Sequence, residues 1–248
     1  MDHSQTHQEG FMSTVAILYP GHSAEDEFVE LEGIVAGARF PVIHTWEGST
    51  DHDVDALLKL GSRDLLEPPS KEAGEAGADA VMWACTSGSF VYGWDGCAEQ
   101  AGWVAAASGA PSSSTSLAFA AALRHLGLSR VSVAATYPED VASHFVEFLG
   151  KGGITVTTLS TYDVPSGEDA GLLGTDWVLD VARAADISGA EALLIPDTAL
   201  HTLAIISELE AALGIPVLTA NQVTAWQGLK LAGHPATAEG LGRLFEAR

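Results

Sequence analysis

The sequence predicts an α/β protein made of two pseudo-symmetric, Rossmann-like lobes, each a parallel sheet flanked by helices. Three observations predict this fold class. Short apolar runs alternate with helical patterns along the whole chain, which is typical of parallel strands joined by right-handed crossovers. Segments of the first half recur in the second half in the same order. In the clearest pair, each copy ends with one reactive polar side chain after a buried strand. An internal duplication of one α/β unit explains all three.

The repeat is clearest where residues 77–86 (GADAVMWACT) align without a gap with residues 189–198 (GAEALLIPDT), at an offset of 112 residues. In this alignment Cys85 of the first copy corresponds to Asp197 of the second. Two shorter pairs keep the same order: 15–20 (VAILYP) with 133–138 (VAATYP), and 108–111 (SGAP) with 213–216 (LGIP). The offset far exceeds the roughly 20–50 residues of stacked repeats, so the pattern indicates a duplication and not a solenoid.

The elements follow in order along the chain. The apolar runs predict strands at residues 14–19, 40–46, 79–84, 111–114, 130–136, 153–159, 190–195 and 216–219. The segments between them predict helices at residues 24–36, 51–60, 68–76, 91–107, 115–126, 139–150, 170–186, 200–213 and 221–232. Gly-Ala-Pro and Gly-Ile-Pro mark helix ends before strands, because glycine caps a helix and proline cannot continue one.

The lobes divide near residue 126. We expect a first lobe of residues 13–126, completed by residues 221–248, and a second lobe of residues 127–220. Residues 1–12 are polar and are expected to form a mobile tail.

The charge balance limits the kinds of partner. Lysine and arginine number 11 against 33 acidic residues, a net charge of −22. No basic stripe is present to bind phosphates, so we expect no nucleic-acid partner. No apolar stretch approaches the roughly 18 residues of a membrane span, and the amino terminus lacks a basic region followed by an apolar one. The sequence thus predicts a cytoplasmic protein without a membrane partner, and it leaves homo-oligomerisation open.

No cofactor is predicted. The chain contains neither Gly-x-x-x-x-Gly-Lys nor Gly-x-Gly-x-x-Gly, the phosphate-binding patterns of nucleotide sites. His22, Glu25 and Asp26 are close in sequence but lack metal-ligand spacing, so we expect a solvated helix start and no metal. The two cysteines, Cys85 and Cys97, predict reduced thiols and not a disulfide framework.

Cys85 is the principal candidate for catalysis. It follows a predicted buried strand and precedes Thr-Ser-Gly-Ser at the start of a helix. Free backbone N–H groups and the positive end of a helix lower the pKa of a neighbouring thiol. A thiolate there would act as a nucleophile or as a base toward carbon. A buried, inert cysteine is the alternative, and it is our interpretation of Cys97.

Asp197 occupies the position equivalent to Cys85 in the second copy. An aspartate before a helix is often only an N-cap. If burial raises its pKa, it could also donate a proton to the face of a substrate opposite Cys85. His201, four residues later, could assist it or could simply be solvated.

Two tyrosines end the first strand of each lobe, in Tyr19-Pro20 and Tyr137-Pro138. Their phenols could donate hydrogen bonds to a substrate carboxylate. The alternative is packing in the core with only the hydroxyl in contact with water.

Together these segments resemble the aspartate/glutamate racemase superfamily, and within it the branch of arylmalonate decarboxylases and maleate cis–trans isomerases. The resemblance covers nearly the whole chain from about residue 13, on Tyr19-Pro20, 83–90 (WACTSGSF), 114–116 (STS), 136–141 (TYPEDV), 194–197 (LIPD) and 213–217 (LGIPV). It implies two lobes that enclose a cofactor-free site with a cysteine from each lobe.

By position, the resemblance implies that Cys85 is the first-lobe cysteine. It implies that Thr86 and Ser87 form a carboxylate cradle and that Tyr137 is its phenolic donor. The remaining predicted substrate-binding residues are Tyr19, Pro20, Thr198 and His201. Asp197 is the departure: racemases and maleate isomerases resemble one another in having two cysteines, and arylmalonate decarboxylases keep only the second-lobe one. This chain keeps only the first.

The resemblance implies a small carboxylate or dicarboxylate substrate. Our leading hypothesis is a cofactor-independent isomerase that resembles maleate isomerase. In it the Cys85 thiolate adds to an unsaturated diacid, the central bond rotates, and Asp197 or His201 transfers the proton. One alternative is a decarboxylase or racemase in which Cys85 transfers a proton to an enediolate. Another is a non-catalytic carboxylate-binding protein.

Overall fold

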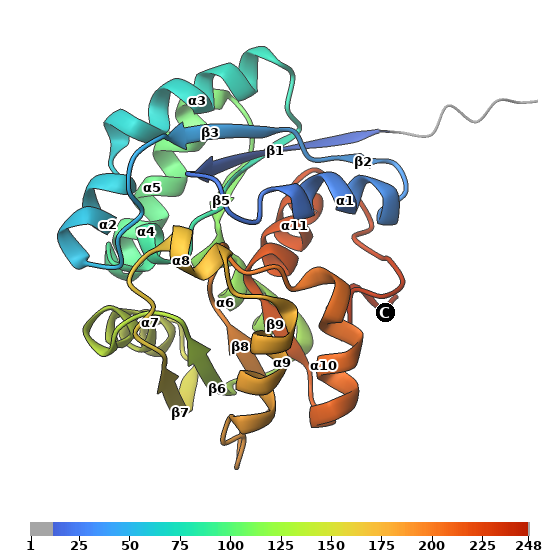
Figure 1. Ribbon diagram of the computed structural model, residues 1–248. Helices are drawn as coiled ribbons and strands as arrows, with labels where there is room; N and C mark the ends of the chain where they lie inside the picture. Colours follow the sequence, from blue (N-terminus) through green and yellow to red (C-terminus); the bar gives the residue numbers. More distant parts are fainter. Residues whose placement is uncertain (1–11, 248) are drawn as a thin grey trace, which may run out of the picture.

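The structure, a computed structural model, describes residues 12–247 and contains two parallel sheets flanked by helices, which confirms the predicted fold class (Figure 1). In the first sheet the order is β2-β1-β4-β5, with β3 also paired to β1. Its strands are β1 (Ser13–Pro20), β2 (Ala38–Arg39), β3 (Val42–Trp46), β4 (Ala80–Trp83) and β5 (Ser112–Ser114). In the second sheet the order is β7-β6-β8-β9. Its strands are β6 (Arg130–Ala135), β7 (Thr155–Thr161), β8 (Ala192–Ile195) and β9 (Val217–Thr219).

The two strand orders are the same when β6, β8 and β9 replace β1, β4 and β5. The repeat in the sequence is therefore also a repeat in topology. It places Cys85 just beyond β4 and Asp197 just beyond β8, at equivalent carboxyl edges. Open parallel sheets bind ligands at such edges.

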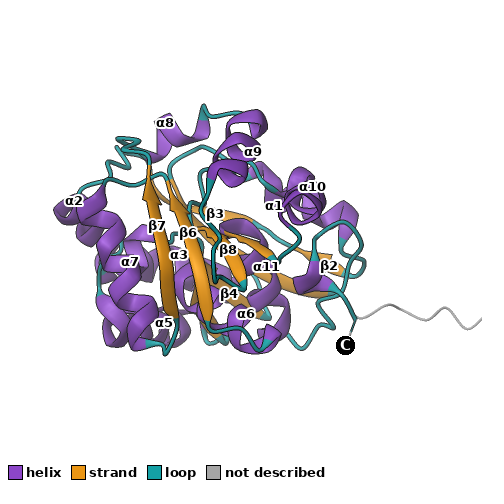
Figure 2. Cartoon of the chain, turned by 90° about the horizontal axis from the view of Figure 1, so that it is seen from below, coloured by secondary structure: helices purple, strands orange, loops and turns teal. Residues whose placement is uncertain are grey.

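Helices cover the sheets, as seen from below in Figure 2. Those before β6 are α1 (Asp26–Ile34), α2 (Val54–Leu60), α3 (Arg63–Glu75), α4 (Ser87–Phe90), α5 (Gly93–Ser108) and α6 (Thr115–Leu126). Those after it are α7 (Glu139–Lys151), α8 (Gly167–Gly171), α9 (Thr175–Ala184), α10 (Ile206–Leu213) and α11 (Ala220–Leu231). Two 3₁₀ helices, η1 (Leu203–Ile205) and η2 (Arg243–Phe245), follow α9 and α11. Among residues 12–247 no helix has the length and apolar character needed to cross a membrane.

Local chemistry explains where the repeated elements begin and end. Ser114 accepts a hydrogen bond from Leu117 N–H at the start of α6, and Thr219 forms a capping box at the start of α11. Gly109 and Gly214 end α5 and α10 with φ of 72° and 73°. These left-handed caps stand at the predicted Gly-x-Pro helix ends.

Several element boundaries differ from those predicted, and the helix expected at 170–186 is divided into α8 and α9. The strand expected at 40–46 begins only at Val42, as β3, and β2 precedes it as a separate strand. Pro41, between them, cannot donate to the ladder. The helix expected at 68–76 begins at Arg63, because the Leu65 and Leu66 N–H groups close its first turn on the Ser62 carbonyl before the prolines are reached. The helix expected at 200–213 begins only after η1, at Ile206.

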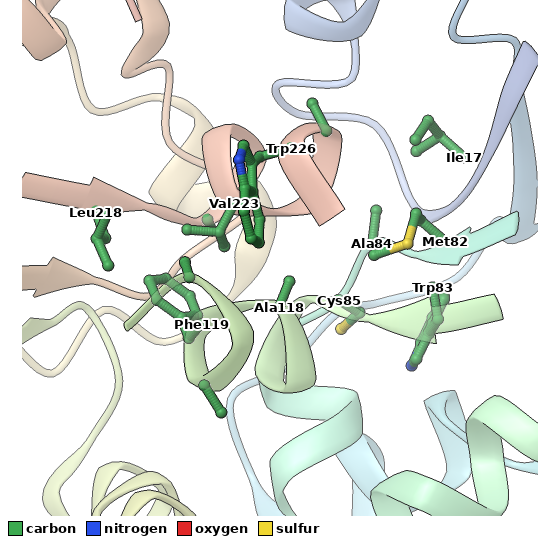
Figure 3. Close-up of a cluster of buried hydrophobic side chains, with 14 of the residues drawn as sticks. Ile17, Met82, Trp83, Ala84, Cys85, Ala118, Phe119, Leu218, Val223 and Trp226 are labelled. Atoms are coloured by element: carbon green, nitrogen blue, oxygen red, sulfur yellow. The ribbon is translucent and has the colours of Figure 1, made fainter. Parts of the chain in front are cut away.

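One hydrophobic cluster extends through both lobes, and α11 joins it to the first sheet. A Cβ added at Gly228 would lie 2.3 Å from Val15 Cγ1 and 2.9 Å from Met82 Cγ, so α11 packs directly on β1 and β4. Figure 3 shows this cluster with Val223 and Trp226 of α11 and with Cys85 after Ala84. The candidate cysteine thus stands at the margin of a continuous core.

Candidate active site

Cys85 lies at the carboxyl edge of the first sheet, and 4% of its surface is exposed. The Gly88 N–H donates to Cys85 Sγ over 3.3 Å, and Ser87 Oγ lies 3.9 Å from the sulfur. A Cβ added at Gly88 would approach Sγ to 3.0 Å, which explains why glycine suits this close contact. Because the sulfur accepts a backbone N–H, negative charge on it would be stabilised.

Burial, and to a smaller extent the charge of Asp197, nevertheless raise the pKa of the Cys85 thiol to about 12. The hydrogen bonds from Gly88 and Ser87 lower the pKa by less than burial raises it. The sequence predicted a lowered pKa for Cys85, whereas the structure gives a raised one, because the strand end is buried away from water. At neutral pH the thiol stays protonated until a base removes its proton.

Cys97, on α5, provides an internal comparison. Its Sγ donates to the Ser89 carbonyl over 2.9 Å, and burial raises its pKa to about 12 as well. Cys85 accepts a hydrogen bond at sulfur, whereas Cys97 donates one. The two thiols therefore differ in geometry although both are buried.

Asp197 is 4% exposed and faces the same cavity as Cys85. Its Oδ2 accepts a short hydrogen bond from Thr136 Oγ1, and its Oδ1 accepts from the Ala199 N–H over 2.9 Å. The second contact is a local cap of the turn after β8. Asp197 therefore caps a turn and not a helix, since η1 begins only at Leu203, and it lines the cavity. Its role as a proton donor stays a prediction.

Both tyrosine hydroxyls donate to backbone carbonyls after β8. Tyr137 donates to the Pro196 carbonyl, and Tyr19 donates to the Thr198 carbonyl over 2.9 Å. Burial raises the pKa of both phenols well above the ordinary value, and for Tyr137 the charges of Asp197 and Cys85 raise it further. Both therefore remain neutral donors at physiological pH.

The predicted carboxylate cradle, Thr86 and Ser87, lies near the Tyr137 hydroxyl, and Ser87 is the one of these three residues that lines the cavity. The nearby hydroxyls of Thr86 and Ser87 lower the pKa of Tyr137, which places the three hydroxyls in one group. Thr86 is fully buried, and Thr86 Oγ1 has no hydrogen-bond partner among the residues that the structure describes. A buried hydroxyl without a partner is costly, and a ligand oxygen would provide one.

One cavity connects the candidates from the two lobes. It is lined by Tyr19, Pro20, Ser23, Thr50, His52, Leu57, Leu60, Cys85, Ser87, Gly167, Asp197, Thr198 and Ala199. Its volume is about 20 Å³, room for about one water molecule. A larger, open depression of about 700 Å³ lies beside α10 and the last turn of the chain, and no predicted site residue lines it.

His201 lies outside this cavity. Its Nε2 is 2.8 Å from Asp26 Oδ1, and 36% of the side chain is exposed. Because the turn after β8 continues to residue 202 before η1 begins, His201 is not on a helix that faces Cys85.

The sequence analysis missed a pair of inter-lobe segments, residues 50–52 of the first lobe and residues 164–168 of the second. Asp51 and Ser166 form an antiparallel bridge, and the Gly167 N–H donates to the Thr50 carbonyl over 3.0 Å. This pair brings Thr50 and His52 into the cavity wall. No motif marks these residues, since their position depends on partners more than 100 residues away.

Possible metal ligands gather at one place among residues 12–247. Ligand atoms of His22, Glu25 and His44 lie within 4.8 Å of one another, outside the cavity. His22 is already bonded to Glu25 at 2.9 Å and to Glu47 at 3.2 Å. We assign His22, Glu25 and Glu47 to a surface ion-pair network, against which the His44 ring packs.

Comparison with known proteins agrees with this geometry. The sequence profile of the arylmalonate decarboxylase family matches residues 64–245, most of the chain. The chain belongs to the arylmalonate decarboxylase family. This confirms the resemblance found in the sequence.

Two relatives indicate the range of activity in the family. The arylmalonate decarboxylase of Bordetella bronchiseptica is 32% identical over 143 residues, 56% of this chain and 60% of that protein. The maleate isomerase of Nocardia farcinica is 29% identical over 124 residues, 50% of this chain and 49% of that protein. The chain therefore matches half to three fifths of the length of these curated relatives.

Solved structures of the same two enzymes have the same fold. A double mutant of arylmalonate decarboxylase in the liganded form superimposes with a TM-score of 0.84 at 26% identity, covering 95% of this chain and 99% of that one. A mutant of the Nocardia farcinica maleate cis-trans isomerase, with a covalently bound succinylcysteine intermediate, gives a TM-score of 0.86 at 24% identity. That match covers 94% of this chain and 98% of the isomerase.

Proposed function

We propose that this chain is a cofactor-independent isomerase that acts at a carbon next to a carboxylate, with Cys85 as nucleophile and an unsaturated dicarboxylate as substrate. The observation that carries the proposal is the sulfur of Cys85, which accepts the Gly88 N–H at the edge of a cavity shared with Asp197. The family includes maleate isomerases, and a homologous fold holds a succinylcysteine.

The reaction is balanced without an oxidant or reductant. The Cys85 thiolate forms a C–S bond with one alkene carbon, and the π electron pair moves toward the neighbouring carboxylate. The proton lost by the Cys85 thiol reaches the other alkene carbon through Asp197. Rotation about the new single bond follows, the same proton is removed, and the thiolate leaves with the double bond restored.

The cradle residues would hold the carboxylate on which charge develops. Thr86 and Ser87 supply hydroxyl donors, and the phenol of Tyr137 supplies a third if it leaves the Pro196 carbonyl. Preorganised donors of this kind are usually the largest contribution to stabilising an enediolate.

A decarboxylase or racemase is the second candidate. One observation favours it: burial keeps the Cys85 thiol protonated at neutral pH, as a proton donor to an enediolate must be. In this reaction the C–C bond of a malonate would break with loss of CO₂, or a C–H bond would break and re-form.

Incubation with maleate and with phenylmalonate in deuterated buffer, followed by NMR, separates the candidates. An isomerase yields the trans diacid from maleate, whereas a decarboxylase yields the deuterated monoacid from phenylmalonate. Cys85→Ser should abolish either product. A protein that binds both acids without product or deuterium exchange would be a carboxylate-binding protein, and the proposed function would be wrong.

A further inference from the structure

His52 reaches the cavity from the inter-lobe segment pair. It precedes α2 of the first lobe, yet its own N–H donates to the Pro165 carbonyl of the second lobe over 2.8 Å. Its surface is 7% exposed, and the side chain lines the cavity together with Cys85 and Asp197. A titratable ring is thus held in the same wall as the candidate nucleophile.

Two contacts fix the orientation of the imidazole. Its Nδ1 lies 2.8 Å from the Val164 carbonyl oxygen. A carbonyl oxygen only accepts hydrogen bonds, so Nδ1 carries the hydrogen and the neutral ring has its lone pair on Nε2. The ring also packs edge-on against Tyr137, with centroids 4.8 Å apart. Within residues 12–247, Nε2 has no hydrogen-bond partner.

The other ionisable groups that line the cavity are already engaged. Both carboxylate oxygens of Asp197 accept hydrogen bonds. The Tyr19 hydroxyl donates to a carbonyl. Among the described residues that line the cavity, His52 therefore has a basic nitrogen, Nε2, that makes no hydrogen bond.

We infer that His52 is the base that takes the proton of the Cys85 thiol, directly or through one bound water, and returns it when the thiolate leaves. The S–H bond breaks as an Nε2–H bond forms, giving thiolate and imidazolium, and the reverse transfer restores both groups. The inference rests on the proposed function, because it assigns the proton acceptor for the same nucleophile.

The energetics of Cys85 explain why a base is needed. With its pKa raised to about 12, an unassisted thiol is ionised in roughly one molecule in 10⁵ at pH 7. A neighbouring imidazole that accepts the proton replaces this rare ionisation with a local transfer. Tyr19 and Asp197 also line the cavity, and the Tyr137 ring packs against the His52 ring. Asp51, Asp53 and Glu168 flank the segments on which His52 is held.

His52→Asn is the sharpest test, because the asparagine amide can keep the hydrogen bond to the Val164 carbonyl while removing the base. His52→Gln and His52→Ala are made beside it, and His144→Asn on α7 is the matched control outside the cavity. Alkylation of Cys85 by iodoacetamide is followed by peptide mass spectrometry across pH. Conversion of maleate and of phenylmalonate is measured on the same samples.

We expect His52→Asn to slow alkylation of Cys85 at pH 7 by at least about 10²-fold, because the thiol then ionises without a base. For the same reason, the alkylation rate should begin to increase only at a higher pH than in the wild type. Turnover should fall by about 10²–10⁴, and added imidazole should partly restore both rates in His52→Ala. His144→Asn should match the wild type.

Wild-type alkylation and turnover in folded His52→Asn or His52→Gln would overturn the inference. If Cys85→Ser is inactive in that case, the proposed function survives without this base. If the wild type converts neither acid, the proposed function fails on those substrates, and the alkylation profile still decides the role of His52.

Discussion

Replacing Asp197 with asparagine tests the asymmetry between the lobes. The carboxylate accepts from Thr136 Oγ1 and, over 2.9 Å, from the Ala199 N–H. Asparagine keeps an oxygen for the Ala199 N–H, but it presents a neutral amide to the Thr136 hydroxyl. Hydrogen bonds to a charged group contribute roughly 1.5–3 kcal/mol, and those to a neutral group roughly 0.5–1.5. We therefore expect the free energy of unfolding to fall by about 1–3 kcal/mol, and Tm to fall by about 2–12 °C.

The same substitution should move two chemical readouts in opposite directions. The charge of Asp197 raises the pKa of the Cys85 thiol, so its removal should lower that pKa and speed alkylation by iodoacetamide. Turnover should fall by about 10²–10⁴, because an amide cannot supply the proton. A substitution that only disrupted the site would lower turnover but would not also make the Cys85 thiol more reactive.

Asp186→Asn is the matched control. Asp186 Oδ1 accepts the N–H two residues later over 2.9 Å, as Asp197 Oδ1 does, but Asp186 is exposed and does not line the cavity. Calorimetry, thiol mapping and NMR turnover are run on both variants. Full activity of Asp197→Asn, with unchanged labelling of Cys85, would refute the reasoning and leave the aspartate as a cap.

Three further predictions follow from the site and the inter-lobe contacts. Cys85 should alkylate faster than Cys97 near neutral pH, and Cys85→Ala should abolish turnover without unfolding; equal labelling would count against a catalytic role. Tyr137→Phe should reduce turnover by about 10²–10³, the usual loss for one oxyanion donor, as measured by NMR; wild-type turnover would contradict the cradle. Burial raises the pKa of Glu27 from 4.5 to about 7, so stability present below pH 4.5 should fall by about 3 kcal/mol as pH rises through 7. Chemical denaturation should find this slope missing in Glu27→Gln, and an equal slope in both proteins would contradict it.

The sequence predicted those parts of the site that depend on the repeat. The alignment paired Cys85 with Asp197, and equivalent strands deliver both to one cavity. Tyr19 and Tyr137 end equivalent strands for the same reason. These positions follow from strand order, which hydrophobic patterns encode locally.

The remaining features depend on contacts that no local pattern encodes. His52 enters the cavity because its segment pairs with residues 164–168, and His201 leaves it because the preceding turn runs on before η1. The raised pKa of Cys85 reflects closure of both lobes over the strand end, whereas the sequence showed only nearby N–H groups. The catalytic assignments of Cys85 and Asp197 themselves stay predictions.

The packing of α11 has a consequence for how the chain is made. Val15 and Met82 lie against Gly228, so these early strands lack part of their cover until residue 228 has emerged. Gly228 is 228 − 15 = 213 residues after Val15 and 228 − 82 = 146 residues after Met82. During synthesis on the ribosome, the first sheet therefore remains partly exposed while the second sheet is translated. Such distant contacts slow folding and leave apolar strands open to aggregation. Production of this protein should therefore respond to chaperone supply and growth temperature more strongly than its compact native fold would suggest.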